Sequence, residues 1–191
     1  SGKGIQNAIK IENWIANAPA GSAFEVTVTG GNGTGATTLS TNDGCAARLK
    51  SGESNVYIIS VYPLAGKDYS VNVSRAGDAT YEPSSAATFE GKTAEAVQSA
   101  LAMSGWNNNA FSGSAFDIRL SGGSGNGALD FTTQGCKVVP AADAGSYTVT
   151  ITALDGEPYT MSATRAGDGN YTATSIEQSG TARNLDEAAV T

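Results

Sequence analysis

The chain has 191 residues, 24 of them glycine, and only 15% of them are charged. Its net charge is −7 with 11 Lys and Arg, which argues against nucleic acid and anionic membranes as partners, because both attract cationic patches. A composition rich in Gly, Ala, Ser and Thr predicts an extracellular or virion-type β protein rather than a helical cytoplasmic enzyme.

The first half of the chain contains three runs in which apolar and polar residues alternate, at residues 24–29, 57–62 and 69–74. Alternation with a period of two is typical of a strand that buries one face. The glycine-rich stretch 30–35 lies between the first two runs and contains an Asn-Gly step, which tolerates the positive φ of a tight turn. These patterns predict antiparallel strands joined by turns.

The segment that follows the third run reads Arg-Ala-Gly-Asp at residues 75–78. The inserted alanine changes the spacing between guanidinium and carboxylate, so the segment does not match an Arg-Gly-Asp adhesion loop. We predict a turn instead, in which Gly77 supplies backbone freedom, Asp78 caps the turn with its side chain and Tyr81 folds back on the sheet.

Residues 93–103 differ from the alternating runs, because they are mostly good helix formers with apolar positions at Val97, Ala100 and Leu101. One interpretation is a short helix that connects two domains. The other is an extended strand that closes the first domain and starts the second. The apolar segment 5–11 near the N-terminus leaves the choice between them open.

The second half of the chain repeats the first. Trp14 recurs 92 residues later as Trp106, and the glycine-rich stretch 30–36 recurs as 122–128. The segment that begins at Arg75 recurs 90 residues later at Arg165. Alternating runs again follow, at residues 116–120, 147–152 and 159–164. We therefore predict two tandem modules, residues 1–92 and residues 93–191.

Each module is expected to be an antiparallel β-sandwich of about seven strands, because two sheets must cover each other's apolar faces. Cys45 and Cys136 occupy matching places in the two modules, so neither module can form an internal disulfide. We expect both to be buried as small hydrophobic residues.

The glycine-rich stretch, the alternating Tyr-rich strands and the Ala-Gly-Asp-x-x-Tyr segments at residues 76–81 and 166–171 together resemble the bacterial immunoglobulin-like (Big-type) repeats of secreted and cell-surface proteins. The resemblance covers nearly the whole chain, twice. It implies an all-β fold of two tandem immunoglobulin-like sandwiches. It also implies a role as a spacer, an adhesive unit, an accessory domain of a secreted enzyme or a decoration on a phage virion.

A ligand site is predicted at Trp106 and the three residues after it, Asn107, Asn108 and Asn109, because an aromatic face beside polar amides is typical of carbohydrate sites. The competing interpretation of Trp106 is a core residue or a residue at the seam between modules. The chain has no histidine, which excludes Ser-His-Asp and Cys-His catalysis. We predict no enzyme activity, no cofactor and no metal site.

The sequence thus predicts a non-catalytic structural or adhesive pair of modules, located outside the cell, on the cell surface or on a virion. Expected partners are neighbouring repeats of a longer array, a surface glycan or a protein. The alternatives are a carbohydrate-binding accessory module and a virion decoration or tail component. The sequence has no apolar run of about 18 residues, so no membrane insertion is expected.

Overall fold

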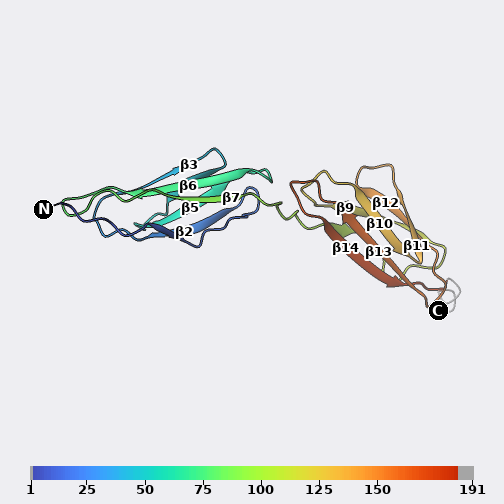
Figure 1. Cartoon of the computed structure of the whole chain (residues 1–191). Coiled ribbons are helices and arrows are strands. Elements are labelled where there is room, and N and C mark those ends of the chain that lie inside the picture. The colour runs from blue at the N-terminus through green and yellow to red at the C-terminus, as the bar shows by residue number, and fades with distance from the viewer. Residues whose placement is uncertain (1, 185–191) are drawn as a thin grey trace. The chain divides into compact units, whose positions relative to one another are not determined.

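A computed structural model describes residues 2–184 of the chain, which form fourteen β-strands. The chain consists of two compact units, Ser1–Ala96 and Val97–Thr191, and each is a two-layered β structure (Figure 1). The strands of the first unit are β1 (Lys10–Glu12), β2 (Ala23–Thr29), β3 (Thr37–Thr41), β4 (Cys45–Leu49), β5 (Val56–Val61), β6 (Asp68–Arg75) and β7 (Ala87–Lys92).

The second unit has seven further strands within the described residues. They are β8 (Ala102–Ser104), β9 (Ala115–Ser121), β10 (Leu129–Gln134), β11 (Cys136–Pro140), β12 (Ser146–Ile151), β13 (Pro158–Arg165) and β14 (Thr174–Thr181). Within residues 2–184, no helix is long and apolar enough to cross a membrane.

Each unit contains one four-stranded and one three-stranded sheet, and all the pairs of named strands are antiparallel. In the first unit the orders are β1-β2-β5-β4 and β3-β6-β7, and in the second they are β8-β9-β12-β11 and β10-β13-β14. This is the strand order of the constant-type immunoglobulin sandwich. The predicted fold, two tandem immunoglobulin-like sandwiches, is confirmed.

The core of each unit lies between its two sheets and is built by alternate residues of the central strands. In β6, for example, Tyr69, Val71 and Val73 point inward and are at most 1% exposed, because successive side chains of a strand point to opposite faces. Burying one such side chain stabilises the fold by roughly 1.5–3 kcal/mol. In the first unit the fully buried aliphatic residues also include Val26 and Ile59, and in the second unit they include Ile118, Val149 and Met161.

The six alternating runs of the sequence all fall on strands, namely β2, β5, β6, β9, β12 and β13. The expectation that both cysteines are buried is confirmed for Cys136, which is 5% exposed, whereas Cys45 is half-buried against the core. Both thiols are free. Removal from water raises the pKa of each thiol, so both stay protonated near neutral pH.

The helical interpretation of residues 93–103 is wrong. The segment is extended, with isolated bridges at Ala94 and Ala96, and it ends in β8. Ala94 donates its N–H to the carbonyl of Ala18 and accepts from the N–H of Ala20, both at 2.9 Å. These bonds take the backbone groups that a helix would need, and tertiary pairing therefore overrides helix propensity here. The boundary between the two units lies after Ala96.

Each unit has its own core and its own pair of sheets, so we predict that each folds alone. Fragments 1–96 and 97–191 should each unfold in one cooperative transition, with a free energy of unfolding within about 0.5 kcal/mol of the value in the intact chain. Urea unfolding followed by circular dichroism measures this. A fragment without a cooperative transition would contradict the prediction.

Candidate functional site

At one end of the first unit, a buried glutamine ties the N-terminal segment to two loops. Gln6 is 7% exposed and donates its side-chain N–H groups to the carbonyls of Ala76, at 3.1 Å, and Glu82, at 2.9 Å. Its side-chain oxygen accepts from the N–H of Gly33 at 3.3 Å. One side chain therefore joins the segment before β1, the β2–β3 loop and the β6–β7 loop. We call this arrangement the glutamine clasp.

Glycines make the clasp possible because the backbones approach too closely for a side chain. A Cβ at Gly30 would collide with the carbonyl oxygen of Ala8 in the N-terminal segment, and Gly30 has a φ of +83°. A Cβ at Gly35 would collide with the carbonyl oxygen of Ala76. Residues 30–36 form a loop between β2 and β3, which belong to different sheets, and the positive φ values lie at Gly30 and Gly31 rather than at the Asn32-Gly33 step that predicted a tight turn. The glycines of this loop serve close packing as well as backbone conformation.

Asp78 caps the β6–β7 loop, as the sequence predicted. Its Oδ1 accepts from the N–H groups of Thr80 and Tyr81, both at 2.8 Å. Its Oδ2 accepts from the N–H of Thr34 at 2.7 Å and from the hydroxyl of the same residue at 3.1 Å. Both carboxylate oxygens are thus occupied by the protein's own donors, and the Arg-Ala-Gly-Asp segment joins two loops.

The Asp78 carboxylate makes the fold sensitive to acid. The backbone N–H groups of Thr34, Tyr81 and Thr80 lower its pKa from 3.8 to about 2, because they bind the charged form. A folded-state pKa below the unfolded one means that this stabilisation is present above about pH 4 and is lost as pH falls toward 2. We expect Asp78→Asn to flatten the fall in the urea midpoint between pH 4 and pH 2. Asp155→Asn, on an exposed loop, is the control, and its urea midpoint should fall between pH 4 and pH 2 as much as that of the wild type.

The second unit repeats the glutamine clasp. Gln98 is 4% exposed, donates to the carbonyls of Ala166 and Thr172 at 3.1 and 2.8 Å, and accepts from the N–H of Gly125 at 3.1 Å. Asp168 again accepts from backbone N–H groups of both loops. These N–H groups lower the pKa of Asp168 below the usual range of an aspartate, and the N–H of Asn126 has the largest effect.

At the opposite end of the first unit, a buried tyrosine holds the segment between β1 and β2. The Tyr69 hydroxyl donates to the carbonyl of Ile15 and accepts from the N–H of Ala18 at 3.1 Å. Ala18 is fully buried, and its carbonyl accepts from the N–H of Ala94 just beyond β7. Burial raises the pKa of Tyr69, which keeps the phenol protonated as a donor. We call this arrangement the tyrosine clamp.

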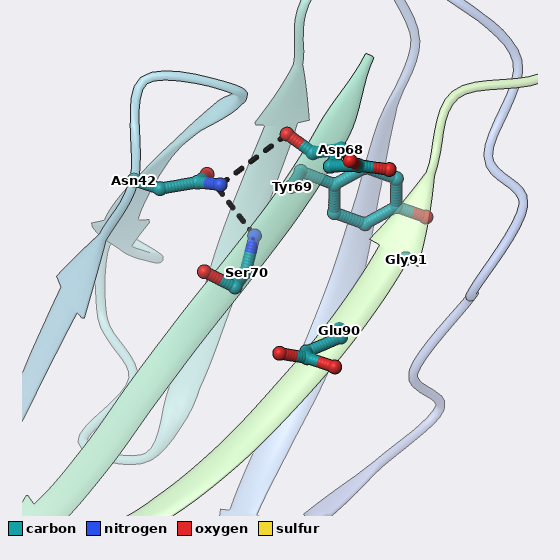
Figure 2. A pocket seen from close by; sticks show the side chains of 6 residues that line it. All are labelled: Asn42, Asp68, Tyr69, Ser70, Glu90 and Gly91. Atoms are coloured by element: carbon teal, nitrogen blue, oxygen red, sulfur yellow. Dashed lines mark hydrogen bonds between the residues drawn. The ribbon is translucent and has the colours of Figure 1, made fainter. Parts of the chain in front are cut away.

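A glycine on the neighbouring strand makes room for the clamp. Tyr69 on β6 lies opposite Gly91 on β7, and Figure 2 shows the tyrosine side chain reaching across to that strand. A Cβ at Gly91 would lie 2.6 Å from the Tyr69 hydroxyl and 2.7 Å from the carbonyl oxygen of Ala16. Trp14 covers the tyrosine ring, with ring centroids 5.5 Å apart, and donates its indole N–H to the carbonyl of Glu90 at 2.9 Å.

The predicted ligand residues Trp106 and Asn107 to Asn109 form the corresponding clamp of the second unit. Trp106 is half-buried between Phe116 and Tyr159 and donates its indole N–H to the carbonyl of Ser179 at 2.9 Å. The Asn107 carbonyl accepts from the Tyr159 hydroxyl.

The other two asparagines are held in the same way. The Asn108 carbonyl accepts from the N–H of Thr181 at 3.0 Å, and the Asn109 carbonyl accepts from Arg183 Nε at 3.2 Å. Although the three asparagines are exposed, their backbones are therefore part of the clamp.

A depression of about 310 Å³ lies beside the clamp of the first unit, lined by Asn42, Asp68, Tyr69, Ser70, Glu90 and Gly91 (Figure 2). The amide of Asn42 spans it, donating to the Asp68 carbonyl at 3.3 Å and accepting from the N–H of Ser70 at 3.1 Å. Asp68 forms an exposed ion pair with Lys92 at 3.2 Å. The second unit lacks the two carboxylates of this depression, because Pro158 stands in the place of Asp68 and Ser179 in the place of Glu90.

Within residues 2–184, no three Cys, Asp or Glu side chains come together in a way that could hold a metal ion. At both ends of each unit, polar side chains bind backbone groups of the same unit. Sequence analysis missed Gln6, Gln98, Gly91 and Gly180 as parts of these ends. The one available signal was recurrence, since Gln6 recurs as Gln98 at the same spacing of 92 residues as the tryptophans.

No protein-family model matches the sequence, and no curated protein does. Several solved structures are similar. The fibronectin(III)-like modules of Clostridium thermocellum CbhA match at 12% identity over 94% of this chain and 96% of that chain, with a TM-score of 0.36. The D00-D0 domain of intimin matches at 10% identity over 93% and 100%, with a TM-score of 0.37. Domains 4 and 5 of the S-layer protein SbsC match at 13% identity over 94% and 100%, with a TM-score of 0.35.

At these identities and TM-scores the likeness carries no inference about function. The class of the protein follows instead from the strand order of each unit, which is that of an immunoglobulin-like sandwich.

Proposed function

We propose that this chain is a structural segment of a longer extracellular bacterial protein, built from Big-type immunoglobulin-like repeats that space or present other parts of that protein. The observation that carries the proposal is that the buried polar side chains at both ends of each unit are engaged in bonds within that unit. In both units a buried glutamine and a buried tyrosine bind the chain's own backbone. Such ends favour a fixed, self-contained module over a site that opens for a substrate.

Antibodies raised against the chain test its location. We expect them to label intact, unpermeabilised cells of the source organism and to detect a larger protein in the surface or secreted fraction. Labelling that appears only after permeabilisation would contradict an extracellular role. Labelling of purified phage particles in place of cells would favour the virion alternative.

Glycan binding at Trp106 and Asn107 to Asn109 is the second candidate. The exposed side chains of the three asparagines support it. The packing and indole bond of Trp106 leave its ring less able to stack on a sugar. In a glycan array, a hit for fragment 97–191 that is lost in Asn108→Ala would support this site. Fragment 1–96 is a natural control, because its equivalent residues are Ile15, Ala16 and Asn17. Complete absence of glycan binding by fragment 97–191 would contradict this second function.

A further inference from the structure

In both units, the segment after the first strand forms a parallel bridge to a residue just beyond the last strand. Bridges join Pro19 to Ala94 in the first unit and Phe111 to Arg183 in the second. Three backbone hydrogen bonds surround the first bridge: Lys92 N–H to Ala16 at 2.8 Å, Ala20 N–H to Ala94 at 2.9 Å and Ala94 N–H to Ala18 at 2.9 Å. This pairing is part of the tyrosine clamp.

The second unit has the same three bonds at the equivalent positions. They are Thr181 N–H to Asn108 at 3.0 Å, Ser112 N–H to Arg183 at 2.8 Å and Arg183 N–H to Ala110 at 3.0 Å. The Tyr159 hydroxyl donates to Asn107 and accepts from the N–H of Ala110 at 3.0 Å, as Tyr69 does with Ile15 and Ala18. The pattern is therefore a property of the module.

The chain enters each unit at the glutamine clasp and leaves it at the tyrosine clamp, at opposite ends of the strands. In the first unit, Tyr69 lies near the start of β6 and Arg75 ends it beside the clasp. Six residue steps of strand separate these two places, which is roughly 20 Å. A pull on the two termini of the unit would therefore move the clamped segment and the end of β7 in opposite directions along their own axes.

We propose that the tyrosine clamp makes each unit resist unfolding when the chain is pulled along its length. The two paired segments are parallel, and the force pulls them past each other along their length. Their hydrogen bonds are therefore loaded together in shear and cannot open one at a time. The inference rests on the proposed structural role, since only a protein anchored at one end and held at the other carries such a load.

Burial strengthens the clamp against water. Ala18 is fully buried and Ala110 is 1% exposed, and the N–H and C=O of each are taken by the tyrosine hydroxyl and the last strand. A buried hydrogen bond that breaks leaves groups that water does not immediately satisfy. The ring of Tyr69 is 1% exposed, and that of Tyr159 is fully buried. Water therefore does not immediately replace the hydrogen bonds of the clamp when they are pulled.

Single-molecule force spectroscopy on the full chain, held by its two termini at constant force, tests the proposal. The wild type should give two unfolding steps, one for each unit. In Tyr159→Phe, one step should become roughly tenfold faster while the other keeps its rate, because the variant removes a buried partner of Ala110 in one unit only. The unchanged first unit is a control within the same molecule.

Val149→Ala is the matched control for loss of stability. Val149 is fully buried in the core on β12 and takes no part in the hydrogen bonds of the clamp. If the clamp bears the load, the core is still packed when the unit yields, so this variant should change the forced rate by less than about twofold. Equal acceleration by Val149→Ala and Tyr159→Phe, at equal loss of stability in urea, would overturn the proposal.

Should Tyr159→Phe fail to fold, Ser112→Pro replaces it with the same expectation, because proline removes the N–H that donates to Arg183. Proline also removes the Ser112 hydroxyl, which donates to the carbonyl of Ala153 at 2.8 Å, so Ser112→Ala, which loses the hydroxyl alone, is its control. The outcome is separate from that of the antibody experiment. A chain that resists force but is found inside the cell would keep the clamp and overturn the proposed location, and a weak chain on the cell surface would do the reverse.

Discussion

Replacing Gly91 by alanine is expected to lower the free energy of unfolding of the first unit by roughly 2–3 kcal/mol. Within a strand, glycine is ordinarily worse than alanine by about 0.5–1 kcal/mol, so the sign of the effect is itself diagnostic. The reason for the reversal is the tyrosine clamp. A methyl group at Gly91 would lie 2.6 Å from the Tyr69 hydroxyl, and the ring cannot move away because Trp14 packs on it.

Urea unfolding of fragment 1–96 measures this change, and Gly2→Ala is the matched control because no atom lies within 4 Å of a Cβ at that position. The control should stay within about 0.5 kcal/mol of the wild type. The same substitution at Gly180 should act on the second unit, where the Cβ would meet Tyr159. An alanine that stabilises either unit would show that the tyrosine ring is not fixed in the clamp.

Replacing Gln98 by leucine is expected to destabilise the second unit by roughly 2 kcal/mol or more, although leucine has a similar size and is more hydrophobic. The glutamine satisfies the carbonyls of Ala166 and Thr172 and the N–H of Gly125, and leucine would leave all three partly buried groups without this partner. The cost of an unsatisfied buried group exceeds what the extra apolar surface returns.

The control for this variant is Gln134→Leu, because Gln134 is exposed on β10. Its free energy of unfolding should change by less than about 0.5 kcal/mol. Both variants are measured in fragment 97–191 by urea unfolding. If Gln98→Leu were as stable as the control, water would have to replace the glutamine, and the clasp would not hold the N-terminal segment of that unit.

The strands that the sequence predicts are those that lie in the middle of a sheet. β2, β5 and β6 bury one face along most of their length, so their apolar residues alternate clearly. β3 is an edge strand with the sequence Thr-Thr-Leu-Ser-Thr, in which only Leu39 is apolar. A strand that contributes one side chain to the core has no period to detect.

The glutamine clasp and the tyrosine clamp could not be predicted because their partners lie far apart along the chain. Gln6 binds carbonyls 70 and 76 residues away, and Tyr69 binds the N–H of a residue 51 positions away. The sequence predicts a ligand site at Trp106 and Asn107 to Asn109 because of their residue types. No local pattern reveals that the carbonyl of Ser179 binds the indole of Trp106 and that the Tyr159 hydroxyl binds the carbonyl of Asn107.

Amide hydrogen exchange of the full chain tests most directly whether the clamp belongs to the stable body of each unit. Ala18 and Ala94, and likewise Ala110 and Arg183, lie outside the regular strands, where exchange is usually fast. Because their N–H groups are bonded within the clamp, we predict that they exchange as slowly as a core amide of the same unit, that of Val71 in β6 for the first unit and that of Met161 in β13 for the second. Exchange as fast as that of the exposed loop residue Leu64 would contradict the clamp, and with it the proposed resistance to pulling.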